Sequence, residues 1–184
     1  MVNQLYGIWI EPPKIIRDEL EIMIHSIEKE FSSLPGIIPH ITLLPAVRGS
    51  NPRLMIKEMK EAVKNFQDIP IKFDGLKTGD SVWKSIYINI EKNAQLQLLF
   101  DSFLKYFSDR LEITPKAFLP HLSLLYGTFS KEKQLEISSR FQNYTFGAHQ
   151  FDFNRLFIVG ELSLFYLQDL NDPASWSLVK RIRL

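Results

Sequence analysis

Two short segments of the chain share one pattern of residue types. Residues 39–44 read PHITLL and residues 120–125 read PHLSLL, so each segment has a histidine followed two positions later by a hydroxyl residue. Side chains two positions apart in a strand project from the same face, about 6.5–7 Å from each other. Each histidine therefore shares a face with its own hydroxyl, and the gap between them has room for a phosphate oxygen that bonds both.

These residue types suit acid–base chemistry on a phosphodiester. The chain contains four histidines, and two of them, His40 and His121, stand in the repeated pattern. Imidazole titrates near neutrality, so one ring accepts a proton from water while the other, protonated, donates to the leaving oxygen. The hydroxyls of Thr42 and Ser123 donate to the non-bridging oxygens and stabilise the charge of the transition state. The sequence does not assign the acid and the base, and it predicts a bell-shaped pH profile with both limbs near neutrality.

A plainer interpretation competes with this one. An isolated histidine-x-hydroxyl pattern more often belongs to a core histidine with its hydrogen bonds satisfied, or to a polar edge strand. Here the pattern occurs twice, each time with a proline before the histidine. This duplication favours the catalytic interpretation.

The two motifs resemble the signature of the 2H phosphoesterase superfamily. Residues 5–10 (LYGIWI), 38–42 (IPHIT), 118–126 (FLPHLSLLY) and 172–184 resemble segments of its eukaryotic cyclic phosphodiesterase (2′,3′-cyclic-nucleotide 3′-phosphodiesterase) branch. The resemblance implies a bilobal α+β fold with two mainly antiparallel sheets, flanking helices, pseudo-twofold symmetry and a central cleft. It also implies hydrolysis, without metal or cofactor, of 2′,3′-cyclic nucleotides to nucleoside 2′-phosphates. A second implied substrate is ADP-ribose 1″,2″-cyclic phosphate, a by-product of tRNA splicing, which would yield ADP-ribose 1″-phosphate.

The resemblance also implies roles for individual residues. His40 and His121 become the acid–base pair, and Thr42 and Ser123 the phosphate-binding hydroxyls. Tyr126 matches an aromatic position that contacts the substrate. Regular strand alternation puts Tyr126 on the face opposite His121, so this role requires the strand to bend or end there.

Four further residues are candidates from their chemistry alone. Trp83, on a strand predicted over residues 82–90, can stack on a nucleobase or ribose, although a packing role explains it equally well. Lys84 beside it can meet phosphate, but a solvated strand lysine is the commoner case. Asp152 or Asp172 can fix the tautomer of a catalytic histidine.

Hydrophobic spacing predicts the elements that position these residues. Strands are expected over residues 5–10, 39–44, 69–73, 82–90, 120–126, 151–159 and 162–167. Helices are expected over residues 14–31, 52–66, 94–107 and 131–142, the last three capped by Asn51, Asn93 and Ser130. Trp9 and Trp176 are expected in the core. Strands and helices alternate without a steady βαβ period, which favours α+β with mainly antiparallel sheet.

Length and composition bound the remaining possibilities. The chain has 184 residues, of which 45% are hydrophobic, which suits a single domain over residues 1–184 with two lobes. The absence of cysteine excludes disulfides, thiolate metal sites and a cysteine nucleophile. No apolar run is long enough to span a membrane or act as a secretory signal, so a cytoplasmic protein without membrane contact is expected.

The balance of positive and negative charges indicates which class of ligand the protein binds. Lys and Arg total 22 against 21 Asp and Glu, so no excess positive charge attracts a long nucleic acid. The expected ligand is a small cyclic-phosphate nucleotide bound by a monomer. Two alternatives stay open, namely a phosphodiesterase acting on RNA 2′,3′-cyclic ends or 2′–5′ linked oligonucleotides, and a non-catalytic nucleotide-binding module.

Overall fold

The computed structural model describes residues 4–31, 34, 36–115 and 117–184. Its strands are β1 (Gln4–Ile10), β2 (Ile41–Gly49), β3 (Ile69–Ser81), β4 (Lys84–Ile90), β5 (His121–Leu125), β6 (Thr145–Phe146), β7 (His149–Gln150), β8 (Leu156–Val159), β9 (Glu161–Leu167) and β10 (Trp176–Arg183). Its α-helices are α1 (Lys14–Glu28), α2 (Pro52–Val63), α3 (Ala94–Phe107) and α4 (Lys131–Gln142). Short 3₁₀ turns follow at Ser108–Arg110 and Pro173–Ser175.

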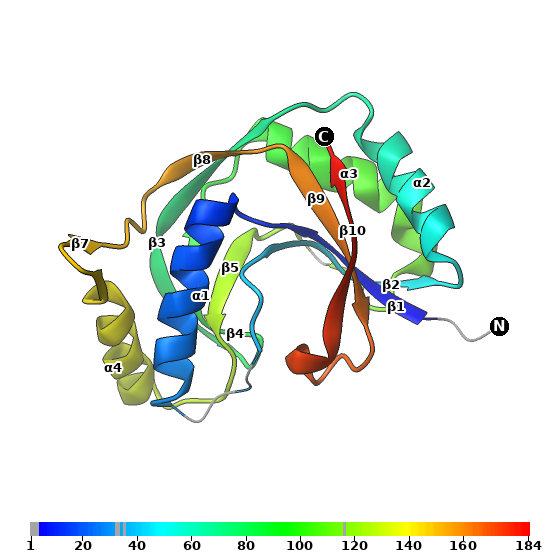
Figure 1. Cartoon of the computed structure of the whole chain (residues 1–184). Helices are drawn as coiled ribbons and strands as arrows, with labels where there is room; N and C mark the ends of the chain where they lie inside the picture. Colours follow the sequence, from blue (N-terminus) through cyan, green and yellow to red (C-terminus); the bar gives the residue numbers. More distant parts are fainter. Residues whose placement is uncertain (1–3, 32–33, 35, 116) are drawn as a thin grey trace.

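A large curled antiparallel sheet is the frame of the molecule (Figure 1). Its strand order is β10-β9-β1-β2-β5-β4-β3-β8, and β6 and β7 form a separate small ribbon. The expected α+β class with mainly antiparallel strands is confirmed. The two sheets expected for two lobes are joined at their central strands, where Ile41 of β2 pairs with Leu122 of β5.

The two halves of the sheet repeat one arrangement. The chain runs β1-α1-β2-α2 and then, after β3, β4-α3-β5-α4, so each motif strand follows a strand and a helix. Each half also takes a strand from the other repeat, because β3 pairs with β4 and β9 pairs with β1. Helix α1 packs on β5 and α4, while α3 packs on β2 and α2. This pseudo-twofold arrangement places the two motif strands side by side at the centre.

The helices begin where the sequence predicts. The side chains of Asn51, Asn93 and Ser130 accept hydrogen bonds from backbone amides in the first turns of α2, α3 and α4. Such caps satisfy amides that have no partner inside a helix. Helix α1 ends at Glu28 rather than at residue 31, because the chain tightens into a turn in which two successive amides donate to the carbonyl of Ile27.

Strand boundaries depart further from the sequence pattern. The strand predicted over residues 69–73 continues to Ser81 as β3. The strand predicted over residues 151–159 begins only at Leu156, because the Asp152 side chain accepts from the Asn154 amide at 2.8 Å and holds the preceding residues in a turn.

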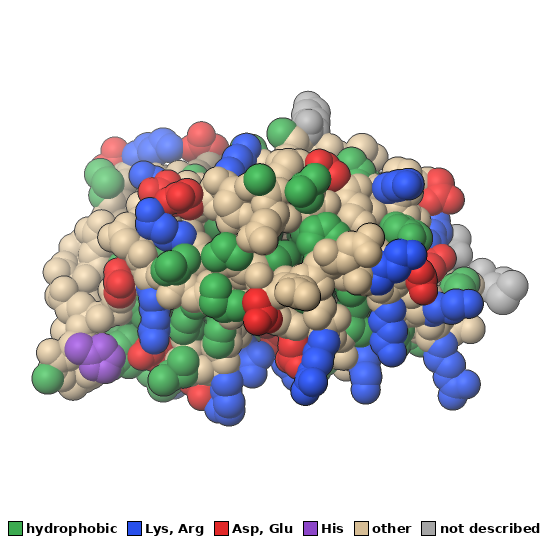
Figure 2. Space-filling view, turned by 90° about the horizontal axis from the view of Figure 1, so that it is seen from above, with side chains coloured by type: hydrophobic (Ala, Val, Ile, Leu, Met, Phe, Trp, Pro, Cys, Tyr) green, Lys and Arg blue, Asp and Glu red, His purple; other side chains and the backbone are tan. Residues whose placement is uncertain are grey.

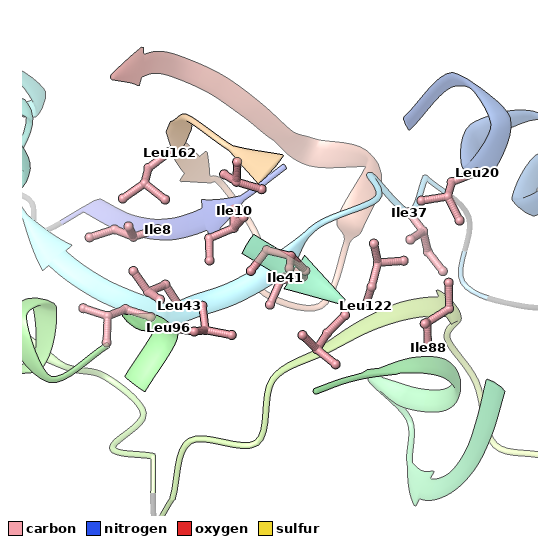
Figure 3. Close-up of a cluster of buried hydrophobic side chains, with 14 of the residues drawn as sticks. Ile8, Ile10, Leu20, Ile37, Ile41, Leu43, Ile88, Leu96, Leu122 and Leu162 are labelled. Atoms are coloured by element: carbon pink, nitrogen blue, oxygen red, sulfur yellow. The ribbon is translucent and has the colours of Figure 1, made fainter. Parts of the chain in front are cut away.

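The apolar residues of both motifs point into the core between the sheet and the helices. Ile41 and Leu122 are fully buried, as are Leu20 of α1 and Leu96 of α3, and Figure 3 shows these side chains in one cluster. Burial of each such side chain stabilises the fold by about 1.5–3 kcal/mol. The core therefore fixes the orientation of the motif strands and turns their polar residues to the opposite face.

The surface mixes both charge signs. Figure 2 shows one face on which Lys and Arg side chains are interspersed with Asp and Glu, with hydrophobic side chains scattered among them. None of the helices in the described ranges combines the length and the apolar composition needed to cross a bilayer.

Candidate active site

The histidines and hydroxyl residues of the two motifs, together with the two candidate aromatic residues, line one cavity of about 520 Å³. Its lining comes mainly from strands and the loops between them, and one residue, Phe100, comes from α3. The six residues are His40, Thr42, Trp83, His121, Ser123 and Tyr126. The sequence-derived set thus comes together in space, although its members come from distant parts of the chain.

The junction of β2 and β5 sets the positions of the four motif residues. Ile41 lies directly opposite Leu122 on the neighbouring antiparallel strand. In the register that this pair sets, His40 lies opposite Ser123, and Thr42 lies opposite the second histidine. Each histidine is therefore beside the hydroxyl of the other motif as well as its own. The result is a patch of two imidazoles and two hydroxyls around one centre.

Both imidazole rings are held in the same way. Nδ1 of His40 lies 2.6 Å from the carbonyl oxygen of Ile38, and Nδ1 of His121 lies 2.8 Å from that of Leu119. A carbonyl oxygen only accepts, so Nδ1 carries the proton in both neutral rings and Nε2 keeps its lone pair. The proline between each histidine and its acceptor favours an extended residue before it, which helps to aim that carbonyl.

Burial keeps both imidazoles neutral in the free protein. His40 is 6% exposed, and the indole of Trp9 stacks on it with 3.7 Å between ring centres. Burial lowers the pKa of His40 to about 4. Burial also lowers the pKa of the half-buried His121, and the nearby charge of Lys84 acts in the same direction. At neutral pH both rings therefore present an unprotonated Nε2 for a ligand.

Tyr126 enters the cavity because the motif strand stops before it. Strand β5 ends at Leu125, so the alternation that would point Tyr126 away from His121 no longer applies. Burial raises the pKa of the Tyr126 hydroxyl far above its usual value, so the side chain is a neutral phenol.

Trp83 lies in a turn, and its prediction on a strand was wrong in this respect. Ser81 pairs with Lys84, so residues 82 and 83 form the tight turn between β3 and β4. The alternation of side-chain types that predicts a strand continues through residues 82 and 83, so the sequence gives no sign of the turn. The Trp83 ring meets Tyr126 edge-on at 5.2 Å between ring centres, and the Ser123 hydroxyl donates to the Trp83 carbonyl at 2.8 Å. The turn is thus tied to the second motif.

Two tryptophans expected in the core contribute to the cavity wall. Trp9 is buried, but one ring face covers His40, and its strand partner is Thr42. Trp176, at the start of β10, is half-buried and lies 6.3 Å from Trp83 between ring centres. Strand register alone brings Trp9 to the motif face, and no local pattern signals it.

The two aspartates considered as partners for the histidines serve their own turns instead. Asp152 accepts from the Asn154 amide, and Asp172 accepts from the Ala174 amide at 3.1 Å. Backbone carbonyls take the place expected for a carboxylate beside each imidazole. Within the described ranges, no group of three or more His, Cys, Asp or Glu side chains is arranged to hold a metal ion.

Comparisons with known proteins bear on the family and the fold of the chain. The model of the family described as cyclic phosphodiesterase-like protein matches residues 5–146. The crystal structure of Escherichia coli LigT complexed with 3′-AMP superposes with a TM-score of 0.66 at 16% identity, over 100% of this chain and 99% of LigT. TT0787 of Thermus thermophilus superposes with a TM-score of 0.61 at 14% identity, over 98% of this chain and 97% of TT0787. These similarities establish a shared fold. A comparison with curated proteins found no significant match.

Proposed function

The chain belongs to the cyclic phosphodiesterase-like protein family of 2H phosphoesterases, and on this premise we propose that it hydrolyses 2′,3′-cyclic nucleotides to nucleoside 2′-phosphates. We extend the proposal to the conversion of ADP-ribose 1″,2″-cyclic phosphate to ADP-ribose 1″-phosphate. The observation that carries it is the matched pair of imidazoles, each with Nδ1 bonded to a carbonyl and Nε2 left for the ligand in one cavity.

The reaction uses the two histidines in complementary states. Water attacks phosphorus while Nε2 of one imidazole takes its proton. The bond from phosphorus to the 3′-oxygen breaks, and the other imidazole, protonated at Nε2, donates to that oxygen. Both rings are neutral in the free protein, so one must gain a proton when substrate binds. The anionic phosphodiester favours this, because a nearby negative charge raises the pKa of an imidazole.

Thr42 and Ser123 hold the phosphate during this step. Their hydroxyls flank the imidazoles and can donate to the non-bridging oxygens, where charge develops. The Ser123 hydroxyl donates to the Trp83 carbonyl in the free protein, so it must turn toward the phosphate when substrate binds. Binding is thereby coupled to the turn that carries Trp83.

The rest of the cavity suits a nucleoside. Trp83, Tyr126 and Trp176 meet at ring-centre distances of 5.2–6.4 Å and offer aromatic surface to a base or ribose. A volume of about 520 Å³ accommodates a small ligand. The related fold of LigT has been solved with 3′-AMP and with ATP, which supports nucleotides as the ligand class.

³¹P NMR of the protein with 2′,3′-cyclic AMP in excess EDTA tests the proposal. We expect the cyclic phosphate signal to be replaced by a single 2′-monoester. A 3′-monoester would still demonstrate phosphodiesterase activity, but the bond from phosphorus to the 2′-oxygen would then be the one that breaks. Loss of activity with EDTA would overturn the metal-independent mechanism. Without turnover, RNA with 2′,3′-cyclic ends and 2′–5′ linked oligonucleotides are the next substrates to try.

A further inference from the structure

Few of the described side chains that line the cavity are charged. Among the described residues that line it, Lys84 is the one whose side chain is ordinarily charged at neutral pH, although burial lowers its pKa. The others are apolar or aromatic, or carry hydroxyl, amide or imidazole groups, and none of these described lining residues is a carboxylate. Since both histidines are neutral in the free protein, Lys84 is the cationic group among these described residues that can offset the cost of moving an anion out of water.

The backbone brings Lys84 close to the second motif. Lys84 follows Trp83 directly, and the carbonyl of Trp83 accepts the hydrogen bond of the Ser123 hydroxyl at 2.8 Å. The peptide unit that leads into Lys84 is therefore in contact with a proposed phosphate-binding side chain. Lys84 itself belongs to the wall of the cavity.

A strand irregularity turns the Lys84 side chain to the side of His121. In a regular strand, residues 84 and 87 would project from opposite faces, but the pairing of β4 with β5 shifts register between Ile86 and Tyr87. Nζ of Lys84 lies 4.2 Å from the centre of the Tyr87 ring, which itself lies 5.5 Å from the ring of His121. Within the described part of the chain, no carboxylate lies at ion-pair distance from this amine.

We propose that Lys84 binds the phosphate of the substrate and stabilises the negative charge that grows on it during hydrolysis. The inference rests on the function proposed above. The cyclic diester carries one negative charge, whereas the monoester formed by adding water carries up to two near neutral pH. An ammonium group interacts more strongly with the doubly charged species. Lys84 therefore contributes more as the reaction proceeds, and it lowers the barrier as well as aiding binding.

Three variants separate this role from packing and from general electrostatics. Lys84→Met keeps the stem and its contact with Tyr87 but removes the charge, and Lys84→Arg keeps the charge. Lys77→Met is the matched control, because Lys77 lies opposite Tyr87 on β3, is exposed, and does not line the cavity. We expect kcat/KM for 2′,3′-cyclic AMP to fall about 10- to 100-fold in Lys84→Met, with a decrease in kcat. Lys84→Arg should keep most of the wild-type kcat/KM, and Lys77→Met should change kcat/KM by less than about twofold.

Binding of inorganic phosphate, followed by NMR shifts of the histidine ring protons, provides a readout without turnover. We expect its Kd to rise about 10-fold or more in Lys84→Met and to stay unchanged in Lys77→Met. If the wild type binds phosphate in this way but hydrolyses no cyclic nucleotide, the proposed function fails while the anion site at Lys84 stands.

Other results overturn the Lys84 proposal. The first is a Lys84→Met variant with the kinetics and the phosphate affinity of the wild type. The second is a loss of kcat/KM in Lys77→Met as large as that in Lys84→Met. The third is a wild type that binds no phosphate, together with an unchanged kcat/KM in Lys84→Met. Thermal unfolding confirms that each variant is folded, and Lys84→Gln replaces Lys84→Met if the latter is not.

Discussion

Ile41 of β2 lies directly opposite Leu122 of β5, and this pair joins the two halves of the sheet. The two side chains are fully buried on the core face. Their contact therefore sets the register of the polar residues on the other face, where His40 comes to lie opposite Ser123. The site depends on this junction, because each motif supplies only half of the acid–base pair.

The junction should make a large contribution to stability. Leu122→Ala removes a fully buried side chain at the meeting point of the two halves, and we expect the free energy of unfolding to fall by about 2–5 kcal/mol. Urea unfolding followed by circular dichroism measures the change. Leu135→Ala is the control, because Leu135 is 68% exposed, and its effect should stay within about 0.5 kcal/mol. Equal effects of the two substitutions would contradict the assigned core.

Each motif histidine should be indispensable for turnover. We expect His40→Ala and His121→Ala each to lower kcat for 2′,3′-cyclic AMP by at least about 100-fold, because each removes one proton transfer. Nucleotide binding, measured by calorimetry, should largely survive. His25→Ala is the matched control, since His25 is exposed and lies outside the cavity. Unchanged activity in His40→Ala would show that the two-histidine mechanism is wrong.

The pH optimum of kcat/KM should lie below neutrality. Burial lowers the pKa of both histidines, that of His40 to about 4. Because kcat/KM reports ionisations of the free enzyme, we expect a bell-shaped profile with both limbs below the ordinary imidazole value of about 6.5. In the kcat profile the limbs should move to higher pH, because bound phosphodiester stabilises imidazolium. A flat profile from about pH 4 to about pH 9 would contradict both assignments.

Stability should also fall on acidification because of His40. Its pKa is about 4 in the folded protein and about 6.5 in the unfolded chain, so the unfolded chain binds more protons between these values. The stabilisation is complete above about pH 6.5 and is lost as the pH falls toward 4. Between pH 7 and pH 4.5, His40 should account for about 2–3 kcal/mol of the decrease in unfolding free energy. His40→Asn should remove this part, and urea titrations of both proteins at the two pH values measure it. An equal decrease in both proteins would exclude His40 as the source.

Trp83 should recognise the nucleobase. Trp83→Ala should raise KM for 2′,3′-cyclic AMP about 10-fold with a smaller effect on kcat, because stacking on a base is worth about 1–3 kcal/mol. The matched substrate is ribose 2′,3′-cyclic phosphate, which lacks the base and should be hydrolysed equally well by both proteins. If the substitution impairs both substrates alike, Trp83 acts through packing of the turn instead.

Much of the site could be predicted from the sequence, because the signals are local. The spacing of His40 and Thr42, repeated at His121 and Ser123, defines two polar faces on two apolar strands. Caps such as Asn51 mark helix starts within a few residues. The alternation of side chains even states the condition for Tyr126, namely that the strand must end before it, and β5 does end at Leu125.

Only the tertiary structure decided which distant strands meet and how each group is surrounded. Trp9 is buried as the sequence predicted, but only pairing register shows that it lies on His40. Register also ends β3 at a turn that carries Trp83, whereas the sequence pattern predicted a strand residue there. The same packing lowers the pKa of His40 and places Lys84 in the wall of the cavity. Hydrophobic periodicity specifies which face of an element is buried, but register, burial and local charge arise from contacts between residues far apart in the chain.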